Sequence, residues 1–212
     1  VNELKIAADK MGVDIWEVIE AASTKPFGFK AFYPGPGLGG HCIPIDPFYL
    51  TWKAKEYGVH TRFIELAGEI NESMPTYVVQ NTSKALNTRK KSINGSSVLL
   101  MGLAYKENVD DMRESPTFHI MDQLKQLGAE VSYFDPHIPV ITSTREHSDW
   151  TGLGSVKWDE TSISQFDCVI ICTDHQCFNY QQLVDWADVV LDTRNALSKA
   201  GVTPKENQRF QS

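Results

Sequence analysis

A cysteine surrounded by glycines and prolines is the feature of this sequence that points most clearly to chemistry. Cys42 lies in the segment 35–47, which reads Gly-Pro-Gly-Leu-Gly-Gly-His-Cys-Ile-Pro-Ile-Asp-Pro, and Asp46 follows it four positions later. The glycines let a ligand approach the main chain closely, and the prolines restrict how far the loop can move. Such a preorganised loop favours nucleophilic catalysis, with Cys42 as the candidate nucleophile.

A helix is expected to begin just beyond this cysteine. Asp46 fits an N-cap, Pro47 the first helical position, and Gly58 the end of the helix. If the N-terminus of this helix faces the sulfur, its partial positive charge favours the reactive thiolate. Cys42 could instead be a structural cysteine, but the loop offers it few apolar neighbours. Capping alone would explain Asp46, so its role stays open at this point.

The same loop contains a formal G-x-G-x-x-G pattern at Gly35, Gly37 and Gly40. A dinucleotide-binding fingerprint needs a strand directly before it and a helix directly after it. Here Pro34 precedes the pattern and Pro36 interrupts it, so we expect no complete dinucleotide-binding motif in this chain.

Composition excludes several classes of protein. The 212 residues carry a formal net charge of −7, which argues against a nucleic-acid-binding surface but allows a small anion to bind through a few local donors. No apolar run approaches the roughly 20 residues needed to cross a bilayer. We see no signal peptide, and therefore expect no membrane contact and a cytoplasmic location. The four cysteines match no disulfide framework or metal-binding pattern, so we expect no metal.

Secondary-structure patterns divide the chain near residue 92. Before that point the spacing of apolar residues is helical, with a helix capped by Asp14 and further helices expected at 62–73 and 76–87, separated by Pro75. This part is expected to form an all-α domain.

Beyond residue 92, strands and helices alternate. Apolar strands are expected at 97–104, 130–135, 167–173 and 188–192, with helices at 115–127 and 179–186. This succession predicts an α/β fold with a Rossmann-like, doubly wound parallel sheet that binds ligands at the carboxyl ends of its strands. Because Lys106, Arg113 and Arg194 lie just beyond such ends, they are candidate anion ligands.

Three ordered motifs carry a resemblance to a known family. They are the loop 32–47, the segments 102–106 (Gly-Leu-Ala-Tyr-Lys) and 110–116 (Asp-Asp-Met-Arg-Glu-Ser-Pro) taken together, and 192–195 (Asp-Thr-Arg-Asn). In combination they resemble the UDP-glucose/UDP-N-acetylhexosamine 6-dehydrogenase family. The Gly-His-Cys-Ile-Pro form of the loop is more similar to the branch that oxidises UDP-N-acetylglucosamine or UDP-N-acetylmannosamine.

The resemblance implies a domain organisation. Residues 1–91 would be the central helical domain with the catalytic cysteine loop, and 92–212 a Rossmann-like domain that binds the UDP-sugar. The N-terminal NAD-binding domain of the family, and the catalytic lysine and asparagine that come before the position matching Asn2, are expected to be absent. The chain would therefore be inactive alone. The resemblance also implies NAD as cofactor, a UDP-sugar as substrate and a homodimer formed through the central helices.

Individual residues acquire roles from the same resemblance. Cys42 would capture the aldehyde formed at C6 by the first of two NAD-dependent oxidations, and Asp46 would orient or deprotonate the water that hydrolyses the resulting thioester. The expected substrate-binding residues are Tyr33, Pro34, Gly35, Pro36, Gly37, Leu38, Gly39, Tyr105, Lys106 and Arg194. The expected cofactor-binding residues are Cys42, Ile45 and Arg113. Ile45 occupies the place of a lysine in the UDP-glucose enzymes, which again favours the N-acetyl branch.

Two other functions stay open from the residues alone. The chain could be a non-catalytic nucleotide-sugar-binding or assembly module in which Cys42 is structural. It could also be a cysteine hydrolase that uses a remote histidine such as His60 or His119, although no second motif supports this class.

Overall fold

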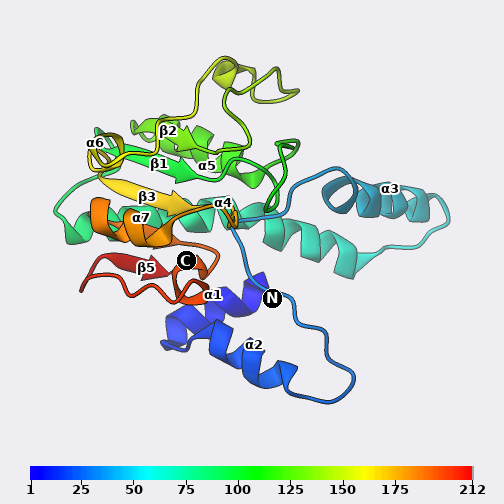
Figure 1. Ribbon diagram of the computed structural model, residues 1–212. Helices are drawn as coiled ribbons and strands as arrows, with labels where there is room; N and C mark the ends of the chain where they lie inside the picture. The colour runs from blue at the N-terminus through cyan, green and yellow to red at the C-terminus, as the bar shows by residue number, and fades with distance from the viewer. Residues whose placement is uncertain (212) are drawn as a thin grey trace.

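The computed structural model describes residues 1–211, which form an N-terminal group of helices followed by a five-stranded sheet with helices on both faces (Figure 1). The α-helices are α1 (Asn2–Met11), α2 (Ile15–Ser23), α3 (Cys42–Glu56), α4 (Arg62–Thr88), α5 (Pro116–Gln126), α6 (Glu160–Ile163), α7 (Tyr180–Trp186) and α8 (Ala196–Lys199). The strands are β1 (Ser97–Met101), β2 (Glu130–Phe134), β3 (Cys168–Ile171), β4 (Val190–Asp192) and β5 (Arg209–Gln211). A 3₁₀ turn, Ser148–Trp150, lies between β2 and α6.

The sheet has the strand order β2-β1-β3-β4-β5, and every neighbouring pair is parallel. In the register, Val98 of β1 lies beside Val131 of β2 on one side and Cys168 of β3 on the other. This arrangement confirms the predicted α/β class with a doubly wound parallel sheet. The order reverses between β1 and β3, which is where such sheets bind ligands. The edge strand β5 was not predicted, because its three residues show no apolar run.

Both faces of the sheet are buried, as expected for parallel strands. Val98 and Leu100 of β1 point into a core shared with α4 and α5, whereas Leu99 and Met101 point into a second core shared with α6, α7 and α8. Figure 1 shows α4 and α7 on opposite faces of the sheet. Successive residues of β1 thus alternate between two apolar layers, which explains the continuous apolar run in the sequence.

The prediction of two helices separated by Pro75 is wrong, because α4 runs unbroken through Pro75 from Arg62 to Thr88. Pro75 removes one main-chain hydrogen-bond donor, but its ring is buried. All the buried residues of α4 lie at or after Met74. The second half of α4 packs on the sheet, and the first half extends beyond it beside α3 (Figure 1).

The expected start of α3 is also wrong. The helix begins at Cys42, with His41 in the capping position, so Asp46 lies inside the helix and does not cap it. Pro44 is compatible with this earlier start, because the first-turn amides of a helix have no main-chain acceptor to lose. Pro47 lies within the helix, where it removes one main-chain hydrogen bond because proline has no amide N–H. By contrast, Asp14 caps α2 as predicted, accepting a hydrogen bond from the Trp16 amide at 2.8 Å.

Within residues 1–211, no helix combines the length and apolar character needed to cross a membrane.

Candidate functional site

The first half of the glycine-proline loop is wedged against the sheet domain. A Cβ atom added to Gly35 would lie 2.5 Å from Nη1 of Arg194, and one added to Gly37 would lie 2.8 Å from Cβ of Pro116. The Gly35 amide donates to Oδ1 of Asn2 at 3.2 Å. Only glycine permits these approaches, so the loop and Arg194, which are far apart in sequence, lie in direct contact.

The second half of the loop meets the segment that follows β1. The Gly40 amide donates to the carbonyl oxygen of Arg113 at 3.0 Å, and a Cβ on Gly40 would lie 2.9 Å from the Tyr105 ring. A Cβ on Gly39 would lie 2.6 Å from the Glu114 carbonyl oxygen. The three motifs that carried the resemblance therefore converge on one loop, which the sequence could not show.

The remaining loop residues divide into buried and exposed positions. Pro34 and Pro36 are buried, whereas Leu38 is exposed. Tyr33 stacks on Trp16 of α2, with ring centroids 5.4 Å apart, and still exposes half of its surface. The prolines thus anchor the loop, and the Tyr33 ring and Leu38 remain accessible to a ligand.

The cationic candidates differ in their partners. Arg113 is exposed, and its Nε and Nη2 groups bind the carboxylate of Asp111, which lowers the pKa of Asp111. Lys106 is exposed, with its Nζ 5.5 Å from the centre of the Tyr105 ring. Arg194 is half-buried and has no carboxylate partner within residues 1–211. A half-buried guanidinium without a partner is well suited to bind an anion.

Cys42 and Asp46 are both exposed and lie one turn apart on α3. Residues four apart lie on the same side of a helix, so the thiol and the carboxylate share one face. Cys42 occupies the first turn, where the positive end of the helix dipole favours an anion. The structure thus provides the helix N-terminus expected beside the sulfur, although this helix begins earlier than predicted.

The other three cysteines are less suited to nucleophilic chemistry. Cys168 and Cys172 belong to β3 and its carboxyl end and are buried, and burial raises the pKa of each thiol to about 12. Cys177 is exposed, but it lies away from the loop, with its sulfur 3.9 Å from Nε2 of His137. Cys42 is therefore the exposed thiol that adjoins the converged motifs.

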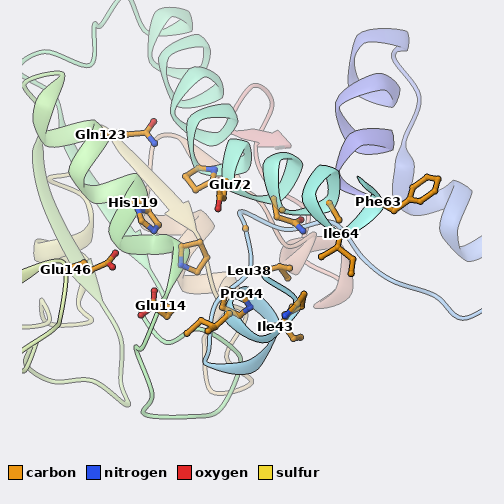
Figure 2. A pocket seen from close by; sticks show the side chains of 18 residues that line it. Leu38, Ile43, Pro44, Phe63, Ile64, Glu72, Glu114, His119, Gln123 and Glu146 are labelled. Atoms are coloured by element: carbon orange, nitrogen blue, oxygen red, sulfur yellow. The ribbon is translucent and has the colours of Figure 1, made fainter. Parts of the chain in front are cut away.

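Two of the cavities beside the loop differ in the charges that line them. Figure 2 shows the larger, of about 770 Å³, which lies between the loop, α4 and α5 and is lined by apolar side chains such as Leu38 and Ile64 together with Glu72, Glu114 and His119. Among the described residues, carboxylates line this cavity without any lysine or arginine beside them, which makes it unfavourable for a diphosphate.

The smaller cavity has a volume of about 480 Å³ and brings together two of the predicted cofactor residues, Ile45 and Arg113. Arg145 and the hydroxyl residues 142–144 also line it, as do carboxylates that include Asp110. Within residues 1–211, no three His, Cys, Asp or Glu side chains gather in a way that could hold a metal ion.

Sequence reasoning missed a buried polar pair beside Tyr105. The carboxylate of Asp135, just beyond β2, accepts hydrogen bonds from the amides of Leu103 and Ala104, and from Nε2 of His175 at 3.1 Å. Burial raises the pKa of Asp135, but the hydrogen bonds from His175 and the backbone lower it by more than burial raises it. The pKa of Asp135 therefore lies below its ordinary value. Both residues lie shortly after a buried strand, Asp135 directly after β2 and His175 four positions beyond β3, and this position is the signal that could have identified them.

Two parts of the chain match one protein family. Residues 1–73 match the central domain of the UDP-glucose/GDP-mannose dehydrogenase family, and residues 99–199 match the UDP-binding domain of the same family. The two matches together include well over half of the chain.

Individual relatives agree with this match. The chain is 34% identical to a UDP-N-acetyl-D-mannosamine dehydrogenase of Methanococcus maripaludis, over 92% of this chain and 44% of the relative. It is 36% identical to a UDP-N-acetyl-D-glucosamine 6-dehydrogenase of Pseudomonas aeruginosa, over 84% of this chain and 40% of the relative. The structure of a UDP-D-ManNAc dehydrogenase from Pyrococcus horikoshii superimposes with a TM-score of 0.81 at 28% identity, covering 99% of this chain and 46% of the other. The chain spans less than half the length of these relatives.

Proposed function

Because this chain belongs to the UDP-glucose/GDP-mannose dehydrogenase family, we propose that it is the substrate-binding and cysteine-bearing part of a UDP-N-acetylhexosamine 6-dehydrogenase. The observation that carries the proposal is the convergence of the loop 33–40 with Tyr105, Arg113 and Arg194. In this assignment, residues 1–91 form the central domain and residues 92–212 the UDP-binding domain, and α4 belongs to the central domain while its second half packs on the sheet.

The UDP-sugar is bound by the loop and the two cationic side chains next to it. Arg194 and Lys106 neutralise the diphosphate, and the glycines let Arg194 and Tyr105 pack directly against the loop. Tyr33, Leu38 and Tyr105 provide the apolar and aromatic surface for the base and the sugar. The net charge of the chain opposes this binding only weakly, because local donors decide the binding of a small anion.

The chemistry on this chain centres on Cys42. Its thiolate attacks the C6 aldehyde, so that a C–S bond forms and the carbonyl oxygen takes up a proton, giving a thiohemiacetal. Two NAD molecules, bound in turn beside Ile45 and Arg113, would supply the oxidising power. One would take the hydride lost when the alcohol becomes the aldehyde and the other the hydride lost when the thiohemiacetal becomes the thioester, with one proton released in each oxidation. Asp46 takes a proton from the water that attacks the thioester, and the C–S bond breaks to release the uronic acid and the thiolate.

The smaller cavity is compatible with the dinucleotide. Arg113 uses Nε and Nη2 to bind Asp111, and Nη1 has no partner within residues 1–211, so its N–H groups can reach a diphosphate. The carboxylates that line the cavity can accept hydrogen bonds from ribose hydroxyls. Ile45, Arg113 and the Cys42 loop would therefore face the cofactor.

We also propose that the chain forms a homodimer through α3 and the first half of α4. Tyr49, Trp52 and Phe63 expose 68%, 63% and 89% of their surfaces there, which is unusual for side chains of this size. Sedimentation of the chain tests this: wild type should be a dimer, and replacement of these three residues by serine should give a monomer. Replacement of the equally apolar but distant Val140, also exposed, should leave the dimer intact.

Calorimetric titration of the chain with UDP and with UDP-N-acetylglucosamine tests the substrate assignment. Arg194→Ala should weaken binding by at least about tenfold, because a charged hydrogen bond contributes about 1.5–3 kcal/mol. Cys42→Ala should keep UDP binding, and Arg62→Ala, at an exposed position that begins α4, is the matched control. A folded wild-type chain that binds neither ligand would contradict the proposal.

A non-catalytic binding module would bind UDP in the same way, so calorimetry cannot distinguish it from the proposed enzyme part, and a second experiment is needed. Under the proposal, Cys42 reacts with iodoacetamide near neutral pH faster than a free cysteine peptide does, because the helix N-terminus favours its thiolate. A Cys42 that reacts no faster than the peptide would favour the binding module.

A further inference from the structure

The segment 102–108, which carries Tyr105 and Lys106, is held by side chains from three other parts of the fold. The Thr117 hydroxyl at the start of α5 donates to the carbonyl oxygen of Gly102 at 3.2 Å, and the Thr173 hydroxyl beyond β3 donates to that of Ala104 at 2.6 Å. The Leu103 and Ala104 amides donate to Asp135 beyond β2 at 2.7 and 2.9 Å. Almost every polar main-chain group before Tyr105 therefore has a fixed partner.

The other end of the segment is held by His175. Its Nδ1 accepts a hydrogen bond from the Asn108 amide at 2.8 Å, and its Nε2 lies 3.1 Å from Oδ2 of Asp135. An amide can only donate, so Nδ1 has no proton and the neutral ring carries its proton on Nε2, directed at Asp135. Both Asp135 and His175 are almost fully buried.

The pair thus connects the two ends of the segment. Asp135 binds it at 103–104, His175 binds it at 108, and the two side chains bind each other. A second hydrogen bond joins the same two segments, because Oδ1 of Asn108 accepts from the Gln176 amide at 3.0 Å. Between the two anchors, the Tyr105 ring is in contact range of Gly40 in the loop.

We infer that Asp135 and His175 are positioning residues for the nucleotide-sugar site, which hold Tyr105 and Lys106 against the glycine-proline loop. This inference rests on the proposed function. Both side chains are almost fully buried, so they act through the segment and not by direct contact. A segment that is ordered before binding loses little conformational freedom when the ligand arrives, so the hydrogen bonds of the pair increase ligand affinity without any direct contact.

A buried polar pair can also serve stability alone, and substitutions of His175 separate the two roles. In His175→Asn, the side-chain oxygen lies about where Nδ1 was and can still accept from the Asn108 amide, but the contact with Asp135 is lost. In His175→Gln, the amide nitrogen can still reach Asp135, but nothing accepts from Asn108. His175→Asn thus keeps the hydrogen bond with Asn108, and His175→Gln keeps the one with Asp135.

If the pair positions the segment, UDP affinity should be kept in the variant that keeps the Asn108–His175 hydrogen bond and lost in the variant that loses it. UDP affinity, measured by calorimetry on the full chain, should fall about tenfold in His175→Gln and stay within about threefold in His175→Asn. Stability should show the opposite order, because Asn108 lies at an exposed position whereas the Asp135 carboxylate is buried. The matched control is His60→Gln at an exposed histidine outside the site, which should change neither quantity.

Hydrogen exchange of the ligand-free chain gives a readout that does not depend on UDP. The Asn108 amide should exchange at least about tenfold faster in His175→Gln than in His175→Asn. If His175→Gln does not fold, Asn108→Gly replaces it. Glycine adopts the positive φ of 58° without strain and removes the side-chain contact with Gln176, so UDP affinity should fall a few-fold. The folding equilibrium constant should change by no more than about fivefold, or about 1 kcal/mol in the free energy of unfolding, which is the cost of the added backbone freedom.

The outcomes distinguish this inference from the proposed function. A wild-type chain that is folded and binds no UDP contradicts both. A wild-type chain that binds UDP, with affinity that falls in the variants only in proportion to their stability, contradicts the positioning role alone. Loss of affinity in His175→Gln together with faster exchange at Asn108 supports it.

Discussion

The contact between the glycine-proline loop and the segment after β1 can be tested at Gly39. A Cβ atom at this position would lie 2.6 Å from the Glu114 carbonyl oxygen, 2.8 Å from Cβ of Tyr105 and 3.1 Å from Cδ of Pro116. Gly39 does not have a positive φ, so Gly39→Ala introduces a purely steric conflict without backbone strain. None of the three atoms is the end of a flexible side chain, so the backbone of one segment must move.

The size of the effect follows from this geometry. Adding a methyl group to a well-packed site costs about 1–3 kcal/mol when its neighbours must shift. If the loop stays in contact, we expect Gly39→Ala to lower the free energy of unfolding by about that amount. If the loop instead moves away, stability is largely kept and the UDP site is distorted. UDP affinity should then fall by about five- to 150-fold, the equivalent of the same free energy.

Urea unfolding and calorimetric titration with UDP together measure both possibilities. Gly154→Ala is a matched control, because Gly154 also lacks a positive φ and an added Cβ would meet nothing closer than the Pro139 carbonyl oxygen at 3.9 Å. It should change the free energy of unfolding by no more than about 0.5 kcal/mol. The packing argument would be refuted if Gly39→Ala matched Gly154→Ala in both stability and UDP affinity.

Two further predictions concern thiols and acid. In the native chain, iodoacetamide should label the exposed Cys42 and Cys177. Cys168 and Cys172 should be labelled only in urea, because burial raises the pKa of each thiol to about 12. Mass spectrometry that shows all four cysteines of the native chain labelled at similar rates would contradict the buried positions. Because the pKa of Asp135 is below its ordinary value in the folded chain, its carboxylate stabilises the fold above about pH 4, and this contribution is lost as the pH falls through the folded pKa. The free energy of unfolding should therefore decline less steeply with acid in Asp135→Asn than in wild type, and parallel acid profiles for the two would refute this role.

Much of the fold could be predicted from local patterns. The strands β1 to β4 are apolar runs bounded by turns, and the cap of α2 by Asp14 and the start of α5 after Ser115 follow from residue types. The errors occurred where tertiary packing outweighs local preference. Pro75 is a helix-breaking residue by its local chemistry, yet burial of its ring and of the following turn against the sheet keeps α4 continuous.

The sequence by itself predicted a nucleophile in the cysteine loop and identified the cationic residues beyond the strands and the family motifs, because these depend on residue type and spacing along the chain. Only the tertiary structure decided that Gly35 lies against Arg194 and Gly39 against Tyr105, and that Asp135 and His175 hold the segment between the strands. These contacts join residues up to 159 positions apart, between Gly35 and Arg194. Spacing along the chain does not specify which elements pack together. That choice follows from burying both faces of the sheet at once, which brings the strand ends and the loop to one place.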